Sequence, residues 1–170
     1  MYTFDNYELG RTEDKVTIES REENRLATIR MGQQSRNSID IISRTLDSHI
    51  YDNQEFIDAV RKTILENHHA RIRILVLDPM VIVKQSHRLV NLAMELITFI
   101  EIRKPGIEYT GFNEALFVAD DCGYIHRLKS DRYEGTVNFN DRRTTKYLLD
   151  SFNEMWSKSH KDMNLRKLHI

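Results

Sequence analysis

Arg71-Ile72-Arg73-Ile74-Leu75-Val76-Leu77 is the stretch of sequence that decides the fold. Its second half is continuously apolar, which is typical of a strand buried on both faces in a parallel sheet with helices above and below. Upstream, Ser38-Ile39-Asp40-Ile41-Ile42-Ser43 is rich in β-branched residues and predicts a second strand. Apolar residues recur every four positions from Phe56 to Ile64, which predicts a helix that begins at Asp52. Strand, helix and strand predict a right-handed crossover unit from Ile39 to Leu77.

The rest of the chain extends this unit into an α/β domain with a mixed β-sheet flanked by helices. Ser20 and Glu23 form a capping-box pattern at a helix start. Gly123 is expected in the turn of a hairpin, with Cys122 exposed beside it. Further helices are predicted over residues 20–33, 141–157 and, as one long helix after Asp78-Pro79, through 83–97. Further strands are predicted over residues 16–19, 100–103, 115–119, 124–126 and 135–139.

The composition restricts the class of protein. The 170 residues include 40% hydrophobic residues, enough for one domain with a substantial core. With 25 Lys+Arg against 26 Asp+Glu, the near-neutral chain has no general electrostatic reason to bind nucleic acid or an anionic membrane. The single cysteine, Cys122, excludes an internal disulfide framework and a multi-cysteine zinc site.

Three regions are expected along the chain. Residues 1–19 are a polar N-terminal arm with a short strand, residues 20–158 are the α/β domain, and residues 159–170 are a C-terminal tail. The arm is expected to be exposed, because it is polar and has no periodicity. No signal peptide or membrane span is recognised, since the apolar segments are too short. The lone thiol fits a cytoplasmic location.

Part of the sequence resembles a known active-site motif. Val118-Ala119-Asp120, a turn containing Gly123, and Gly135-Thr136-Val137-Asn138-Phe139 resemble the second half of the phospholipase D motif. In that superfamily, His-x-Lys and four residues precede the aspartate, and a turn and strand lead to Gly-Ser-x-Asn-Phe. The order of elements from Ser38 to Ser157 is also similar to that superfamily. The resemblance implies a single phospholipase D-like (nuclease-like) domain.

Other segments resemble an uncharacterised bacterial branch of the superfamily. These are Ser43-Arg44-Thr45-Leu46-Asp47, Asp131-Arg132-Tyr133-Glu134-Gly135 and Asn138-Phe139-Asn140-Asp141. That branch is loosely associated with fusion to acyl-CoA N-acetyltransferase domains. The resemblance therefore implies a bacterial protein with an acetyltransferase-related partner. Superfamily members with one motif copy pair as homodimers, so the resemblance also implies a homodimer.

The departures from the motif predict a loss of chemistry. With Asp120 as the motif aspartate, Asn113 and Ala115 occupy the histidine and lysine positions. In the family, histidine attacks phosphorus and lysine neutralises phosphate charge. An asparagine amide is no nucleophile and alanine carries no charge, so we predict a domain without phosphodiesterase activity. Thr136 and Asn138 retain the hydroxyl and the amide of the motif, which hydrogen-bond an anion without cleaving it.

A pocket for a small anionic or phosphorylated ligand is predicted at the carboxyl ends of the strands, where open α/β sheets bind ligands. Arginine suits bidentate capture of phosphate. The predicted ligand-binding residues are Arg44, His87, Arg103, Thr136 and Asn138. The alternative is a structural network in which Arg44, His87, Arg88 and Arg103 pair with Asp47, Asp78, Glu101 and Asp131.

The alternative hypothesis is an enzyme of the phosphodiesterase or nuclease type whose catalytic residues lie at other positions than in the motif. It would use His87 or His126 as acid or base, with Asp78, Asp121 or Asp131 as partners. No histidine cluster has metal-ligand spacing, so neither a metal site nor a cofactor is predicted. Nucleic acid and membranes are not expected as partners.

Overall fold

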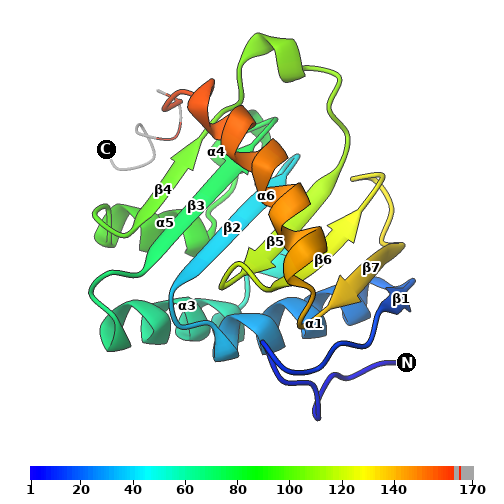
Figure 1. The fold of residues 1–170 in the computed structure, drawn as a ribbon. Helices are drawn as coiled ribbons and strands as arrows, with labels where there is room; N and C mark the ends of the chain where they lie inside the picture. The colour runs from blue at the N-terminus through cyan, green and yellow to red at the C-terminus, as the bar shows by residue number, and fades with distance from the viewer. Residues whose placement is uncertain (163–164, 166–170) are drawn as a thin grey trace.

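A mixed sheet of seven strands, ordered β1-β7-β6-β5-β2-β3-β4, runs through the molecule (Figure 1). The computed structural model describes residues 1–162 and 165. The strands are β1 (Val16–Ile18), β2 (Ser38–Ser43), β3 (Arg71–Val76), β4 (Ile100–Arg103), β5 (Ala115–Ala119), β6 (Gly123–Arg127) and β7 (Gly135–Asn138). The helices are α1 (Arg21–Gln34), α2 (Ser48–Tyr51), α3 (Gln54–Glu66), α4 (Met80–Val83), α5 (Arg88–Glu95) and α6 (Arg142–Ser157), with a 3₁₀ turn at Ile107–Tyr109.

The crossover unit in the middle of the sheet is confirmed. β2 pairs parallel to β3, which pairs parallel to β4, and α3 connects the first two strands. On its other side β2 pairs antiparallel to β5. Every residue of β2 is buried, as its β-branched sequence predicts. The carboxyl ends of the three parallel strands therefore meet at one edge of the sheet.

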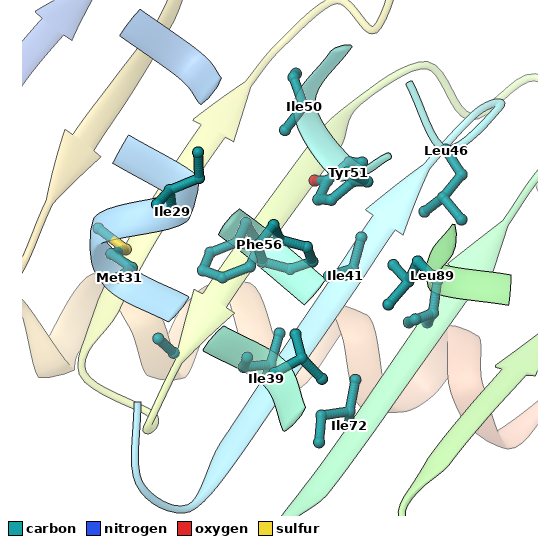
Figure 2. Close-up of a cluster of buried hydrophobic side chains, with 14 of the residues drawn as sticks. Ile29, Met31, Ile39, Ile41, Leu46, Ile50, Tyr51, Phe56, Ile72 and Leu89 are labelled. Carbon is teal, nitrogen blue, oxygen red and sulfur yellow. The ribbon is translucent and has the colours of Figure 1, made fainter. Parts of the chain in front are cut away.

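Helices cover the two faces of the sheet unequally (Figure 1). α1, α3 and α5 pack on one face and bury the larger apolar cluster, in which Phe56 and Met31 are fully enclosed (Figure 2). α6 alone packs on the other face, where Phe152 and Met155 contact a smaller cluster that includes Leu116. Within the described residues, no helix is long and apolar enough to cross a membrane.

Local capping explains where the first two long helices begin. The predicted capping box of α1 is confirmed, since the Ser20 hydroxyl accepts from the Glu23 N–H at 3.1 Å and the Glu23 carboxylate accepts from the Ser20 N–H. The predicted start of α3 at Asp52 is one residue early. Asn53 is the N-cap, and its side-chain oxygen accepts from the Phe56 N–H at 2.9 Å, because Asp52 still ends the short helix α2.

The long helix predicted after Asp78-Pro79 is wrong. Pro79 is the N-cap of a one-turn helix, α4, and no side chain caps it. The chain then straightens at His87, which has an extended backbone and begins α5. The apolar pattern continues through this break because both helices pack on the same core, so periodicity alone did not reveal it. Ile97, the last residue of the predicted helix, lies after the end of α5 and is exposed.

The hairpin between β5 and β6 is confirmed, but its turn is built differently from the prediction. Asp120 and Asp121 take the left-handed conformation, with φ of 53° and 56°, whereas Gly123 already belongs to β6. A Cβ atom at Gly123 would lie 2.5 Å from the end of the Leu9 side chain and 3.2 Å from the carbonyl oxygen of Phe139, so the glycine occupies a tightly packed position. Cys122 is buried rather than exposed, because the segment around Gly10 packs against its sulfur.

The N-terminal arm does not have the exposed start that its composition suggested. Phe4 is 2% exposed and packs against the rings of Tyr7 and Phe139. The Arg30 side chain donates to the carbonyl of Phe4, which holds this segment on α1. At the other end, His160 forms a β-bridge with Lys104. The expected C-terminal tail includes residues 163–164 and 166–170, which lie outside the described residues.

Candidate functional site

A cavity of about 350 Å³ opens where β2, β3 and β4 end. We call it the Arg44 cleft; its principal side chains are Arg44, Asp78, Lys104, Ile107, Tyr109 and His160. Arg44 and Asp78 follow β2 and β3, and Lys104 follows β4, so the parallel strands place all three at one edge. This is the position at which open α/β sheets bind ligands.

Two cations face the Arg44 cleft. The guanidinium of Arg44 is held at the wall, because it donates to the carbonyl of Phe112 and, at 3.4 Å, to the hydroxyl of Ser130. Neither Arg44 nor Lys104 has a carboxylate within ion-pair distance in the described part of the chain. Among the described residues, Asp78 is the one carboxylate that lines the cleft. The cleft therefore has an excess of positive charge, which suits an anion.

A buried arginine, Arg127, lies next to Ala115, which is the residue at the position of the motif's lysine. Arg127 pairs with Ala115 across the β5–β6 hairpin and is only 5% exposed. Its guanidinium donates to the carbonyls of Arg132 at 2.8 Å and Ser130 at 3.4 Å, and lies 5.4 Å from the centre of the Tyr133 ring. This charge holds the connection between β6 and β7 in place and lines none of the cavities described here.

Asn113, at the position equated with the motif's histidine, is also engaged. Its side-chain oxygen accepts from the hydroxyl of Ser130 at 2.6 Å, and its carbonyl accepts from the Ser130 N–H at 2.7 Å. An amide in this arrangement supplies neither a nucleophile nor a base. Asn113 and Ser130 thus join the start of β5 to the connection after β6.

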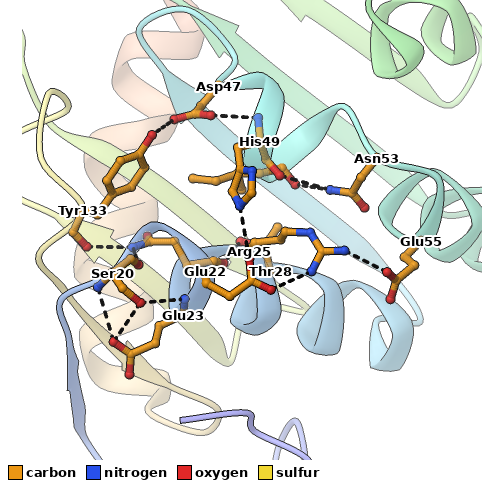
Figure 3. A network of polar contacts seen from close by, with 12 residues as sticks. Ser20, Glu22, Glu23, Arg25, Thr28, Asp47, His49, Asn53, Glu55 and Tyr133 are labelled. Atoms are coloured by element: carbon orange, nitrogen blue, oxygen red, sulfur yellow. Dashed lines mark hydrogen bonds and ion pairs between the residues drawn. The ribbon is translucent and has the colours of Figure 1, made fainter. Parts of the chain in front are cut away.

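A polar network attaches the same connection to α1 and α2 (Figure 3). The hydroxyl of Tyr133 donates to Asp47 at 2.7 Å, and Asp47 also accepts from the N–H of His49 at 2.9 Å. Burial, with the Asp47 carboxylate adding to it, raises the pKa of Tyr133 above its ordinary value. Tyr133 is therefore protonated at neutral pH and donates its hydrogen bond to Asp47. This bond attaches the connection between β6 and β7 to the start of α2.

His87 and Arg103, both predicted as ligand-binding residues, lie outside the Arg44 cleft. His87 is 6% exposed; its Nε2 donates to the carbonyl of Leu46 at 3.0 Å, and its Nδ1 accepts from the Leu89 N–H at 3.1 Å. Burial lowers the pKa of His87, which favours this neutral form. Arg103 pairs with Glu101 at 2.8 Å and lies 4.5 Å from the centre of the Trp156 ring.

Thr136 and Asn138 lie elsewhere on the sheet. Thr136 lines a second cavity of about 350 Å³ together with His126, its cross-strand neighbour. Asn138 is buried near the turn of the β5–β6 hairpin, where it pairs with Tyr124 and donates to the carbonyl of Glu13 at 3.2 Å. Of the five ligand-binding residues that the sequence suggested, only Arg44 lines the Arg44 cleft, so the structure does not bring the set together.

The residues proposed for the alternative enzyme, in which other side chains take over catalysis, are also dispersed. His126 lies 2.6 Å from the carboxylate of Glu114, which the sequence did not single out. Asp78 lines the Arg44 cleft, whereas Asp131 is exposed in the connection before β7. Of the alternative structural network, the pair between Arg103 and Glu101 is present. Among the described residues, no group of three or more His, Cys, Asp or Glu side chains is placed to hold a metal ion.

Arg127 and Lys104 are the charged residues that sequence reasoning missed. The signal for Arg127 was available in the hairpin register, because Ala119 pairs with Gly123 and Ala115 therefore pairs with Arg127. Lys104 directly follows β4, so the strand order places it at the same edge as Arg44. Its bridge to His160 joins residues far apart in the sequence and has no local sequence signal.

Residues 20–168 match the family DUF7931, which is described as a domain of unknown function. The chain belongs to this family. No curated protein matches the sequence. Among solved structures, the chain is similar to TrmBL2, an archaeal chromatin protein for which a novel mode of DNA binding is described. The two share 19% identity and a TM-score of 0.65, over 92% of this chain and 55% of TrmBL2, so this DUF7931 chain spans about half the length of that protein.

Two further structures place the fold. Nuc from Salmonella typhimurium, a phospholipase D family member, has 9% identity and a TM-score of 0.61, over 88% of this chain and 99% of its own. NucT from Helicobacter pylori has 11% identity and a TM-score of 0.58, over the same 88% and 99%. At these identities the likeness concerns the fold alone. The expected phospholipase D-like fold is therefore confirmed, and function must be argued from the site.

Proposed function

We propose that this DUF7931 domain is a phospholipase D-like module without phosphodiesterase activity, and that it binds a small phosphorylated ligand in the Arg44 cleft. The observation that carries the proposal is the placement of Arg44 and Lys104. They come from the ends of two different strands, line one cavity, and have no carboxylate within ion-pair distance in the described chain. Unpaired cations that share a cavity are typical of a phosphate site.

The loss of activity is argued from the motif positions. Asn113 and Ala115 supply no nucleophile and no charge, and Ala115 is buried against Arg127. Arg127 is buried, donates to backbone carbonyls of a loop and does not line the Arg44 cleft, so its charge is not placed to neutralise a phosphate there. The motif is therefore degenerate on this reading, and the family's covalent step has no residue to perform it.

The shape of the Arg44 cleft suits a ligand with an apolar part. Ile107 and Tyr109 line the same cavity as the charged residues at the strand ends. A volume of about 350 Å³ falls at the small end of ligand pockets. A phosphorylated metabolite or a mononucleotide would place phosphate on Arg44 and Lys104 and its apolar part on Tyr109.

The binding test compares two lysines that differ in position. Phosphorylated metabolites at millimolar concentration are screened by thermal shift, and the best ligand is titrated by calorimetry against Lys104→Gln and Lys129→Gln. We expect a loss of about tenfold in affinity for Lys104→Gln, equivalent to one charge-assisted hydrogen bond, and no change for Lys129→Gln, which lines the other cavity. Stabilisation by no anion at all would contradict the proposal.

The catalytic test uses an activated phosphodiester. We expect no release of nitrophenol from bis(4-nitrophenyl) phosphate above the buffer rate. The pair of His126 and Glu114 is the one observation that favours the alternative, a phosphodiesterase or nuclease with relocated residues. Turnover that His126→Ala or His87→Ala abolishes would establish that enzyme and overturn our assignment.

Partners remain predictions. DNA binding is described for TrmBL2, but a net charge of −1 argues against strong nonspecific affinity here. The homodimer and the acetyltransferase-related partner are expected only from the resemblance. Light scattering on the purified chain tests the homodimer directly, since a monomer mass would contradict it.

A further inference from the structure

A larger cavity lies at the opposite end of the sheet from the Arg44 cleft. It measures about 690 Å³, and we call it the Arg142 cavity. Arg36 and Asn37, which line it, immediately precede β2, whereas Arg44 immediately follows that strand. Six residues of extended chain, about 20 Å, therefore separate the two cavities. The Arg142 cavity owes nothing to the phospholipase D motif's histidine and lysine positions.

The floor of the Arg142 cavity is fixed by hydrogen bonds. The Asp120 carboxylate accepts from the backbone N–H groups of Arg36, Asn37 and Ser38, at 2.8–3.1 Å from its nearer oxygen in each case. On the other side, Gly10 donates to the carbonyl of Phe139 at 2.8 Å. These bonds satisfy the charge of Asp120 within the backbone. They also leave the floor rigid, so a ligand would meet a preformed surface.

Three cations from three separate segments surround this floor. Arg36 belongs to the turn before β2, Lys62 to α3 and Arg142 to the first turn of α6. None of the three has a carboxylate within 4 Å in the described part of the chain. Glu66 also lines the cavity without an ion-pair partner there, so the unpaired groups retain a positive excess.

A fourth cation at the rim is already neutralised. Arg11 pairs with Glu8 at 3.6 Å, and both side chains are largely exposed. This contrast shows that carboxylates are present at the rim, yet they do not neutralise Arg36, Lys62 and Arg142. The charges of Arg36, Lys62 and Arg142 are therefore not used in an ion pair within the described residues and are available to an anionic ligand.

We propose that the Arg142 cavity is a second binding site, which takes a ligand with a chain of phosphate groups, such as the polyphosphate part of a nucleotide. Arg36, Lys62 and Arg142 would each contact a different phosphate. The Arg142 cavity has about twice the volume of the Arg44 cleft, which leaves room for more than one phosphate group beside the three cations. The proposal is independent of the Arg44 cleft, and either site can fail without the other.

The test uses inorganic tripolyphosphate as the probe, titrated into the full chain by calorimetry at low ionic strength, with orthophosphate for comparison. Lys62→Gln and Arg142→Gln are compared with Arg143→Gln, which changes the adjacent exposed arginine that does not line the cavity. We expect about tenfold weaker binding for each of the first two variants and no change for Arg143→Gln, because one charge-assisted contact is worth about tenfold. Orthophosphate should bind at least tenfold more weakly than tripolyphosphate.

Three outcomes would overturn the proposal. Equal losses for Arg142→Gln and Arg143→Gln would show diffuse surface attraction instead of a site. A loss of tripolyphosphate binding in Lys104→Gln would assign the probe to the Arg44 cleft. A short oligothymidylate that displaces the probe more tightly than a nucleoside triphosphate would show that the cavity takes a phosphodiester backbone. Thermal unfolding of each variant, unchanged from the parent chain, confirms that only surface charge has been altered.

Discussion

The two faces of the sheet differ in how completely helices cover them. α1, α3 and α5 together cover one face with an almost purely apolar layer. The single helix α6 covers the other, and beneath it lies a buried ion pair in which Arg73 donates to Asp40 at 2.7 Å. The Arg44 cleft opens on this second face, since its wall residues Leu77 and Tyr109 pack against the cluster under α6.

The comparison teaches that the thinly covered face carries polar side chains, some in a buried ion pair under α6 and others at a cavity. On this face the row formed by Leu116, His126 and Thr136 begins under α6 and ends in a cavity. On the well-covered face the corresponding positions, such as Phe117, are sealed by helices. The next four variants test this contrast, from the largest expected effect on stability to the smallest.

Phe56→Ala should give the largest loss, because it empties the middle of the well-covered face. The ring is fully buried and makes edge contacts with Tyr51 and Phe117, at centroid distances of 5.7 and 6.1 Å. We expect a fall of about 4 kcal/mol in the free energy of unfolding, measured by urea denaturation. Leu65→Ala on the exposed side of α3 is the control, with a change below about 0.5 kcal/mol. Similar losses for the two variants would contradict the assigned core.

Arg73→Met should cause the second largest loss in the free energy of unfolding, because it leaves the Asp40 carboxylate buried and unpaired under α6. We expect a loss of about 3 kcal/mol at neutral pH. Burial raises the pKa of Asp40, against the lowering effect of Arg73. Without Arg73 the folded state therefore takes up a proton more readily than the unfolded state, and the loss should shrink as the pH falls. The double variant Asp40→Leu with Arg73→Met should recover most of the stability; no recovery would sink the ion-pair explanation.

His87, which lies at the start of α5 on the well-covered face, should make the free energy of unfolding depend on pH. Burial lowers the pKa of His87 below its ordinary value of 6.5, so the unfolded chain binds the proton more readily. The stabilisation that neutral His87 gives the folded state is therefore complete above pH 6.5. It declines as the pH falls from 6.5 toward the lower pKa of His87 in the folded state. His87→Asn retains an oxygen that can accept from the Leu89 N–H but does not titrate. It should cost about 1 kcal/mol at neutral pH and reduce the acid sensitivity, measured by urea denaturation across this range. An unchanged pH profile would rule out His87 as its origin.

Arg103→Gln should have the smallest effect. The side chain is partly exposed, and its contacts are the Trp156 ring and Glu101. We expect a loss of about 0.5 kcal/mol by thermal or urea unfolding. We also expect unchanged affinity for any ligand of the Arg44 cleft, which Arg103 does not line. A large loss of affinity would mean that the cleft extends further along β4.

Much of the fold could be predicted because its signals are local. The Ser20 and Glu23 box, the apolar run of β3 and the periodicity of α3 each depend on neighbours in sequence. The errors occur where distant residues decide. α5 begins at His87, where the Leu46 carbonyl, far away in the sequence, accepts a hydrogen bond from the Nε2 of the imidazole ring. Phe4 is buried because Phe139 lies beside it.

The site could be predicted only in part, for the same reason. Arg44 was expected at the end of a parallel strand, and the Arg44 cleft is there. Asn138 was grouped with it on the strength of the motif, but the strand register puts Asn138 opposite Tyr124, near the hairpin turn. The motif fixed the order of residues along the chain. It did not reveal the extra pairing of β6 with β7, which turns Asn138 away from the Arg44 end of the sheet.

The bridge between Lys104 and His160 affects which backbone groups at the edge of the sheet are available to other molecules. β4 is an edge strand, and edge strands offer unpaired amides and carbonyls to other chains. The two backbone hydrogen bonds of the bridge, 2.8 and 3.0 Å long, occupy these groups where β4 ends. The backbone of His160 thus covers the position that follows the edge strand β4. A chain that stops at Ser157 should lose solubility before it loses its fold.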